Sequence, residues 1–135
     1  MAKGDLAFFK MIVDDLDRVA NFYKDVFGMH ELFRMKESIT DDMPIEEVLL
    51  TSADNENEQK LNLMLVKMLD KEAPKDSTLI IGFLVGDIAE VCDSVLKNGG
   101  KIIRPASLIK EQGVICAVVS DISNCLIELV QPYTQ

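Results

Sequence analysis

The stretch AFFKMIVDDLDRVANFYKDVFG, from Ala7 to Gly28, decides the fold of this 135-residue chain. Its apolar beginning, Phe8 to Val13, predicts a strand, and the residues after Asp15 predict a helix that ends at Gly28. Asp15 can cap that helix, and glycine tolerates the left-handed turn that often ends one. The helix has one apolar face, because its apolar residues recur every three or four positions: Leu16, Val19, Ala20, Tyr23 and Phe27.

The same pattern occurs a second time in the chain. A shift of 72 places Val13 on Val85, Asp15-Leu16 on Asp87-Ile88, and Gly28 on Gly100. The second copy predicts a strand from Leu79 to Val85 and a helix that Asn98-Gly99-Gly100 stops, with an apolar face made of Ile88, Val91, Cys92 and Val95. Because self-similarity at a fixed period marks repeated structural units, the sequence predicts two similar halves.

Three short strand candidates follow each predicted helix. They are His30 to Met35, Glu46 to Thr51 and Lys60 to Val66 in the first half, then Lys101 to Arg104, Val114 to Val119 and Cys125 to Gln131 in the second. Polar turns separate them, and in one of these turns Asn124 can adopt a positive φ. The order strand, helix and three strands therefore occurs twice along the chain, and this order predicts an α+β fold.

A charged segment separates the two halves. DKEAPKDS, from Asp70 to Ser77, contains a proline and predicts a linker over about residues 69–77. The first module then covers about 5–68 and the second about 78–133, and we expect both to belong to one domain, residues 1–135.

Composition excludes several classes of partner. A formal charge of −9 repels nucleic acid and anionic membrane surfaces. No apolar run approaches the roughly 18 residues of a membrane span, and the N-terminus lacks the apolar segment of a secretory signal. We therefore expect a cytoplasmic protein, in which Cys92, Cys116 and Cys125, which have no CxxC spacing, are free buried thiols.

Three motifs together resemble a known family. They are VDDLDRVANFYKDVFGM (Val13 to Met29), VGDIAEVCDSVLKNGGKI (Val85 to Ile102) and SDISNCLIEL (Ser120 to Leu129). Over nearly its whole length the chain resembles the vicinal oxygen chelate superfamily, which includes glyoxalase I (lactoylglutathione lyase), extradiol dioxygenases, fosfomycin-resistance proteins and bleomycin-binding proteins. The third motif departs from the family's Asp-Pro-Asp-Gly turn, because Ile122 and Ser123 replace the proline and the second aspartate.

The resemblance implies a fold and a site. The fold is a glyoxalase-like pair of βαβββ modules that form a curled mixed sheet around a cleft, commonly within a homodimer. Members that do chemistry hold a divalent metal there, with ligands from the first and last strands of each module. In this chain those positions are Phe8 and Ile80, related by the shift of 72, and Asn62 and Glu128, related by a shift of 66 that aligns LNLML with IELVQ.

These four residues do not make a metal site. Phenylalanine and isoleucine donate nothing, and one carboxylate with one amide oxygen is too few donors for a transition metal. The single histidine, His30, lies outside the four positions, and we interpret it as solvated or structural. We therefore expect no metal and no cofactor, and metal-dependent glyoxalase I or extradiol dioxygenase activity is disfavoured.

Period-two alternation predicts which side chains line the cleft. If Phe8 faces inward, Lys10 does too, and the expected ligand-binding set is Phe8, Lys10, Asn62, Met64, Ile80, Leu126 and Glu128. This set is mostly apolar with a few polar points, which is typical of small-molecule pockets. Lys10 and Glu128 are then expected to pair with each other or with a ligand, since an unpaired buried charge is costly. The acidic run Glu37 to Glu47 is interpreted as a solvated loop, or secondly as a lid.

Three functional hypotheses remain open. The first is a metal-free member that binds a small, partly apolar organic molecule. The second is a lyase, isomerase or dioxygenase-type enzyme in which Glu128 is a general base or metal ligand and Lys10 stabilises an anion. The third is a structural or interaction dimer without a ligand. For Phe8, Met64, Ile80 and Leu126, plain core is the first interpretation and ligand contact the second.

Overall fold

The computed structural model describes residues 2–76 and 79–133. By its internal contacts the chain divides into two compact units, Met1–Lys75 (unit 1) and Asp76–Gln135 (unit 2). This division falls inside the predicted linker, whose last residue, Ser77, lies outside the described residues. That the two modules make one domain stays a prediction.

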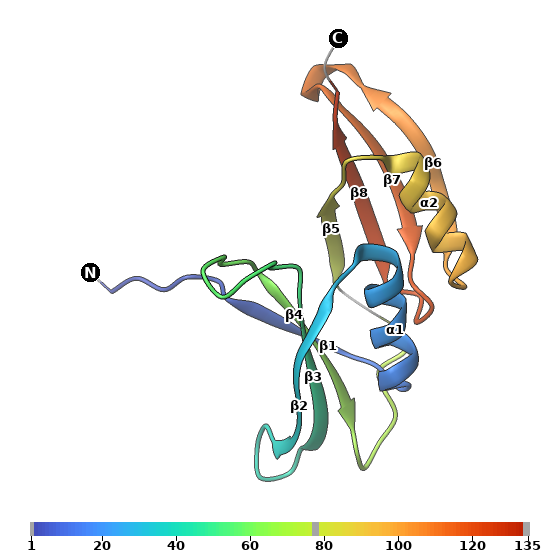
Figure 1. Ribbon diagram of the computed structural model, residues 1–135. Helices are drawn as coiled ribbons and strands as arrows, with labels where there is room; N and C mark the ends of the chain where they lie inside the picture. The colour runs from blue at the N-terminus through green and yellow to red at the C-terminus, as the bar shows by residue number, and fades with distance from the viewer. Residues whose placement is uncertain (1, 77–78, 134–135) are drawn as a thin grey trace. The chain divides into compact units, whose positions relative to one another are not determined.

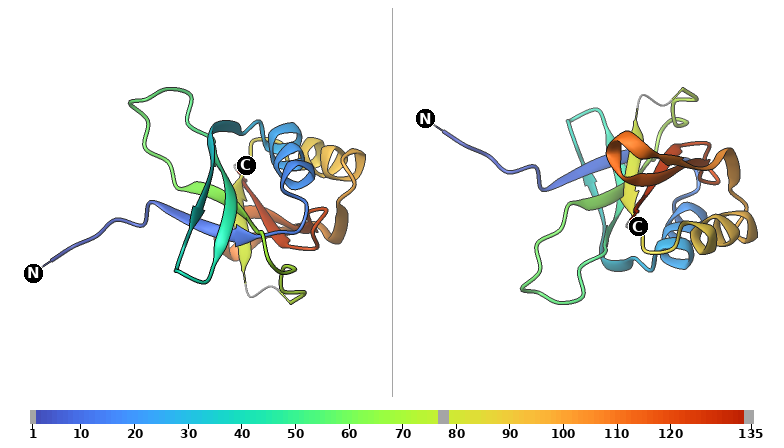
Figure 2. Two further views of the ribbon diagram at one scale, coloured as in Figure 1. Left: turned by 90° about the horizontal axis from the view of Figure 1, so that it is seen from below. Right: turned by 90° about the horizontal axis from the view of Figure 1, so that it is seen from above.

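Unit 1 is a four-stranded mixed sheet with one helix (Figure 1). Its elements are β1 (Phe8–Ile12), α1 (Leu16–Phe27), β2 (His30–Ser38), β3 (Pro44–Thr51) and β4 (Asn62–Met68). The strand order is β1-β4-β3-β2, with β1 parallel to β4 and the other pairs antiparallel. The helix lies along one face of the sheet, where it contacts β3 and β4 (Figure 2).

Unit 2 repeats this architecture. Its elements are β5 (Ile80–Leu84), α2 (Ile88–Lys97), β6 (Lys101–Ile109), the 3₁₀ turn η1 (Lys110–Gln112), β7 (Val114–Ser120) and β8 (Leu126–Pro132). The order β5-β8-β7-β6 corresponds strand for strand to that of unit 1. The prediction of two βαβββ modules in an α+β fold is therefore confirmed.

Both helices begin and end as the sequence predicts. Asp15 and Asp87 have extended backbones, and their side chains accept hydrogen bonds from the amides of Arg18 and Glu90, three residues further on. Gly28 closes α1 at φ 66°, in the left-handed region that glycine adopts without strain.

The apolar faces of the helices supply much of each core. In α1 the buried residues are Leu16, Val19, Ala20, Phe22 and Tyr23, while Phe27 is half-buried and stacks on Tyr23 with 5.9 Å between ring centroids. In α2 only Ile88 and Val95 are buried. Strand alternation completes the core, as in β8, where Ile127 and Leu129 are fully buried and their neighbours are not.

The loop interpretation of the acidic run is wrong. Residues Glu37 and Glu47 belong to β2 and β3, and only residues 39–43 connect these two strands. Several strands also extend beyond their predicted ends, most of all β6, which reaches Ile109 through Pro105. Proline is tolerated there because β6 is an edge strand, whose outer amides need no ladder partner.

The turn before β8 forms despite its departure from the family pattern. The Asp121 side chain is buried and accepts hydrogen bonds from the amides of Ser123 and Cys125 and from the Ser123 hydroxyl. Asn124 has φ 68°, which confirms the positive φ expected of it. One buried carboxylate therefore organises this turn without the proline of the family pattern.

Two further expectations can be compared with the structure. Cys116 and Cys125 are buried and Cys92 is half-buried, and none of the three forms a disulfide. No helix among the described residues is both long enough and apolar enough to cross a membrane.

Candidate functional site

The predicted cleft residues of unit 1 share one face of its sheet. Phe8 lies opposite Asn62 and Lys10 lies opposite Met64 in the parallel β1–β4 ladder, so all four side chains point the same way. Phe8 is 48% exposed, whereas Met64 is buried. These four residues therefore lie together on one sheet face of unit 1, and their role in ligand binding stays a prediction.

Lys10 is held by two acids of its own unit. Its Nζ lies 2.8 Å from Glu47 Oε2 on β3 and 3.5 Å from Glu37 Oε1 on β2, and the Phe8 ring centroid is 5.9 Å away. The Glu47 side chain is only 3% exposed, so this carboxylate relies on Lys10 for its compensation. The partner of Lys10 is thus Glu47, and neither Glu128 nor a ligand is required.

This network also sets the charge of the lysine. Burial by itself lowers the pKa of Lys10, but the hydrogen bond and charge of Glu47, with a contribution from Glu37, outweigh it and raise the pKa above its usual value. Lys10 is therefore a firmly held cation that its neighbours largely neutralise.

The corresponding sheet face of unit 2 is open and mostly apolar. Ile80 is 62% exposed and Leu126, directly opposite it, is 37% exposed. Glu128 is exposed as well and lies opposite Gly82, where a Cβ would meet nothing within 4 Å. The Glu128 side chain makes no hydrogen bond or ion pair with another of the described residues. Glu128 is therefore an exposed carboxylate on a mostly apolar surface, with open space next to it at Gly82.

The strand ladders correct one step of the sequence arithmetic. Phe8 pairs with Asn62 and Ile80 pairs with Leu126, so the ladder equivalent of Asn62 is Leu126, a shift of 64 and not 66. Glu128 lies two residues further along the same face. The apolar pattern could not detect this difference, because a slip of two residues along a strand leaves every side chain on its own face.

The four positions that the resemblance implies carry few donor atoms for a metal. Phe8 and Ile80 have no donor atom, whatever the placement of the two units, and only the amide of Asn62 and the carboxylate of Glu128 remain. Within residues 2–76 and 79–133, no three His, Cys, Asp or Glu side chains gather in a way that could hold an ion. These residues do not fit a divalent metal centre.

A hollow of about 810 Å³ lies at one end of the unit 1 sheet. The N-terminal arm, the beginnings of β2 and β4, and the connection from β3 to β4 form its walls. This arm and this connection leave the sheet on the same side (Figure 2). Of the predicted ligand-binding residues only Asn62 lines the hollow.

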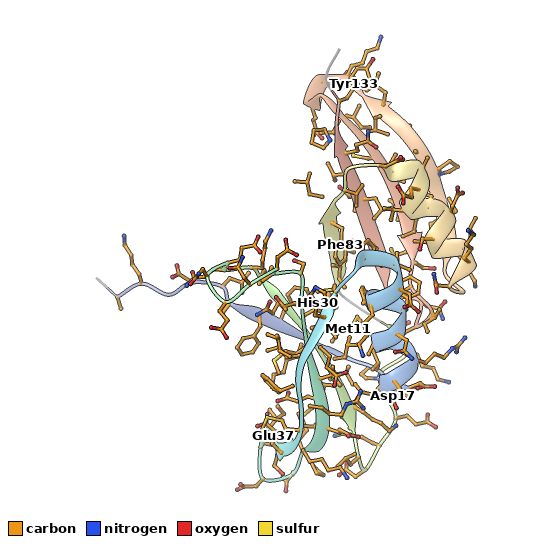
Figure 3. The ribbon with its side chains drawn as sticks, in the orientation of Figure 1. Met11, Asp17, His30, Glu37, Phe83 and Tyr133 are labelled. Atoms are coloured by element: carbon orange, nitrogen blue, oxygen red, sulfur yellow. The ribbon has the colours of Figure 1, made fainter. Side chains whose placement is uncertain are left out.

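His30 also belongs to the wall of this hollow. It is exposed at the first position of β2, at the opposite end of that strand from Glu37 (Figure 3). Its interpretation as a solvated histidine is compatible with that position. Asn62 differs, because its Oδ1 is buried and has no hydrogen-bond partner within the described part of the chain.

Comparison with known proteins identifies the family. The model of the glyoxalase/bleomycin resistance protein/dioxygenase superfamily matches residues 5–129. The chain belongs to this superfamily. It is 30% identical over 119 residues to a lactoylglutathione lyase of Haemophilus influenzae, covering 88% of this chain and 86% of that protein. A probable lactoylglutathione lyase of Synechocystis is 31% identical over 122 residues, covering 88% of each.

Solved structures of the superfamily share the fold at low identity. A glyoxalase family protein from Bacillus cereus superposes with a TM-score of 0.81 at 17% identity, with 99% of both chains covered. A glyoxalase I mutant from Zea mays gives a TM-score of 0.76 at 22% identity, and the match covers 93% of this chain but 45% of the maize chain. This chain therefore spans about half the length of the maize protein.

Glu47 is the member of the charged network that sequence reasoning missed. The sequence places Glu47 in the acidic run, but Glu47 also lies two residues before Leu49 and therefore on the same face of that strand. Because Glu47 is the second residue of the predicted strand 46–51, its place on a strand could be predicted. The strand register that brings β3 within reach of Lys10 could not.

Proposed function

We propose that this protein is a metal-independent member of the superfamily that binds a small, partly apolar organic molecule. The observation that carries this proposal is the residue type at two implied metal-ligand positions, where Phe8 and Ile80 cannot coordinate an ion. The exposed apolar residues around Glu128 and the hollow in unit 1 support ligand binding.

The relatives named lactoylglutathione lyase suggest a different activity, which we do not assign to this chain. The resemblance implies that glyoxalase I chemistry needs a metal held by four donors, and this chain offers two at the matching positions. At about 30% identity, a shared fold with a changed site is a common outcome, because function depends on the site and not on the fold.

Enzyme action through Glu128 is the weaker alternative. It needs Lys10 to stabilise a developing anion, but Lys10 already pairs with Glu47 at 2.8 Å and with Glu37 at 3.5 Å. A cation that two carboxylates neutralise is poorly suited to that task.

We further expect the protein to act in the cytoplasm as a homodimer. The maize glyoxalase I chain is about twice as long as the segment this chain matches, so two copies of this chain would supply a comparable number of modules. Light scattering coupled to gel filtration checks this, and a monomer at micromolar concentration would contradict it.

A metal titration with a gain-of-function variant tests the proposal. Wild-type protein is expected to retain less than about 0.1 equivalent of Zn²⁺ or Ni²⁺ after dialysis, and to show no lactoylglutathione lyase activity. The variant Phe8→His/Asn62→Glu/Ile80→His gives each of the four implied metal-ligand positions a nitrogen or carboxylate donor and is expected to retain about one equivalent. Stoichiometric metal in the wild type that Glu128→Gln abolishes would overturn the proposal.

A further inference from the structure

The hollow in unit 1 has a chemistry of its own. All its lining residues fall between Asp5 and Asn62, so it is complete without unit 2. Its volume, about 810 Å³, lies in the range of about 300–1,000 Å³ that is usual for sites of drug-sized molecules.

Apolar surface gathers around the hollow. Leu6, Leu32 and Leu61 line it and are 78%, 61% and 47% exposed. They come from three separate segments: the N-terminal arm, β2 and the connection before β4. Single exposed leucines are ordinary on protein surfaces, but three around one concavity favour an apolar occupant.

The charged groups of the hollow are mostly negative. Asp5, Asp54, Glu56 and Glu58 line it against a single lysine, Lys60. Glu58 is already engaged, since it accepts the Asp54 amide hydrogen at 2.6 Å and lies 3.6 Å from Lys60, contacts that lower its pKa. No ion pair is recorded for the other three carboxylates among residues 2–76 and 79–133.

The inner wall of the hollow adds no free acceptor. Asn62 begins β4, and its Oδ1 is buried, so an occupant of the hollow does not reach that atom. Its neighbour in the wall, Thr51, is 4% exposed and already accepts the Ala53 amide hydrogen.

From this combination we propose that the hollow binds a small amphipathic cation, an organic ammonium or guanidinium compound with an apolar body. The apolar body lies against the three leucines, and the cation faces the unpaired carboxylates. The field of the acidic rim, in a protein of net charge −9, attracts such a ligand and repels an anion of the same shape. This rests on the proposed small-molecule binding and gives it a location and a ligand class.

A matched probe series tests the charge requirement. The full chain, ¹⁵N-labelled, is titrated with 2-phenylethylamine, 2-phenylethanol and 3-phenylpropionate while amide NMR shifts are followed. The amine is expected to move the signals of residues 52–62 saturably, with an affinity about tenfold above that of the alcohol, and the carboxylate is expected to move none. No saturable shift with the amine, or equal affinity for the alcohol, overturns the proposal.

Two sets of variants locate the effect. Asp54→Asn/Glu56→Gln removes two rim charges and is expected to weaken amine binding about fivefold. The control Asp70→Asn/Glu72→Gln removes the same charge from the connection after β4, outside the hollow, and is expected to leave the affinity within about twofold. Equal weakening by both pairs would show a general charge effect and would refute a local site.

Glu128→Gln separates this inference from the proposed function, because Glu128 does not line the hollow. If the affinity for a bound ligand falls in Glu128→Gln but not in Asp54→Asn/Glu56→Gln, this inference is refuted and the proposed function still stands.

Discussion

The Lys10–Glu47 pair offers the sharpest test of how unit 1 is held together. Lys10→Met keeps most of the side-chain volume but leaves the Glu47 carboxylate, which is 3% exposed, without the cation at 2.8 Å. Breaking a buried pair costs about 3–5 kcal/mol, and a hydrogen bond to a charged group is worth about 1.5–3 kcal/mol. Because the Lys10 side chain is 28% exposed and partly screened, we expect a loss of about 2–3 kcal/mol in the free energy of unfolding at pH 7.

A double variant shows whether the unpaired buried charge of Glu47 causes the loss of stability in Lys10→Met. In Lys10→Met/Glu47→Met both charges are absent, and the cost is expected to fall to within about 1 kcal/mol of the wild type, since an apolar pair of similar volume often replaces an ion pair without loss. The coupling energy of the cycle is then about 2 kcal/mol. Lys36→Met, on exposed β2, is the matched control and is expected to change stability by less than about 0.5 kcal/mol.

Urea unfolding followed by circular dichroism measures these differences from the midpoint and the slope m. The coupling energy is expected to persist in 0.5 M NaCl, because salt screens a buried pair much less than a surface pair. The reasoning is refuted if Lys10→Met is as stable as the wild type, or if the double variant is as unstable as Lys10→Met.

Three further predictions concern the local structure of unit 1. Asp15→Ala removes the cap of α1 and is expected to cost about 1 kcal/mol by urea unfolding, whereas Asp15→Asn, which keeps the acceptor, is expected to cost less. Gly28→Ala places a Cβ at φ 66° and is expected to cost about 1–2 kcal/mol through backbone strain alone, since a Cβ there meets nothing within 4 Å; a neutral substitution contradicts the left-handed turn. Hydrogen bonds from Lys24 first and then Arg34 lower the pKa of Glu31, so its contribution is present above the unfolded pKa and is lost as the pH falls through the lower folded pKa. Glu31→Gln is therefore expected to lose a few tenths of a kcal/mol at pH 7 and nothing at pH 2, and an equal loss at both pH values argues against this pairing.

Much of the local structure could be predicted because it depends on neighbours in the sequence. The Asp15 cap lies three residues before the amide that it binds, and Gly28 supplies its own conformational freedom. The turn at Asp121 is local in the same way, which is why its Asn124 could be given a positive φ from sequence. The repeat at a shift of 72 extended these local predictions from one unit to the other.

The sequence by itself thus determined the two βαβββ modules, the ends of their helices, and the absence of donor atoms at Phe8 and Ile80, because residue type and periodicity carry that information. Only the tertiary structure decided that Lys10 meets Glu47 and that Leu126, not Glu128, lies opposite Ile80. Such contacts join strands that are distant along the chain, and a ladder register is set by loop lengths and cross-strand packing that the apolar pattern does not record. The hollow beside Asn62 has the same origin, since it exists where three such segments converge.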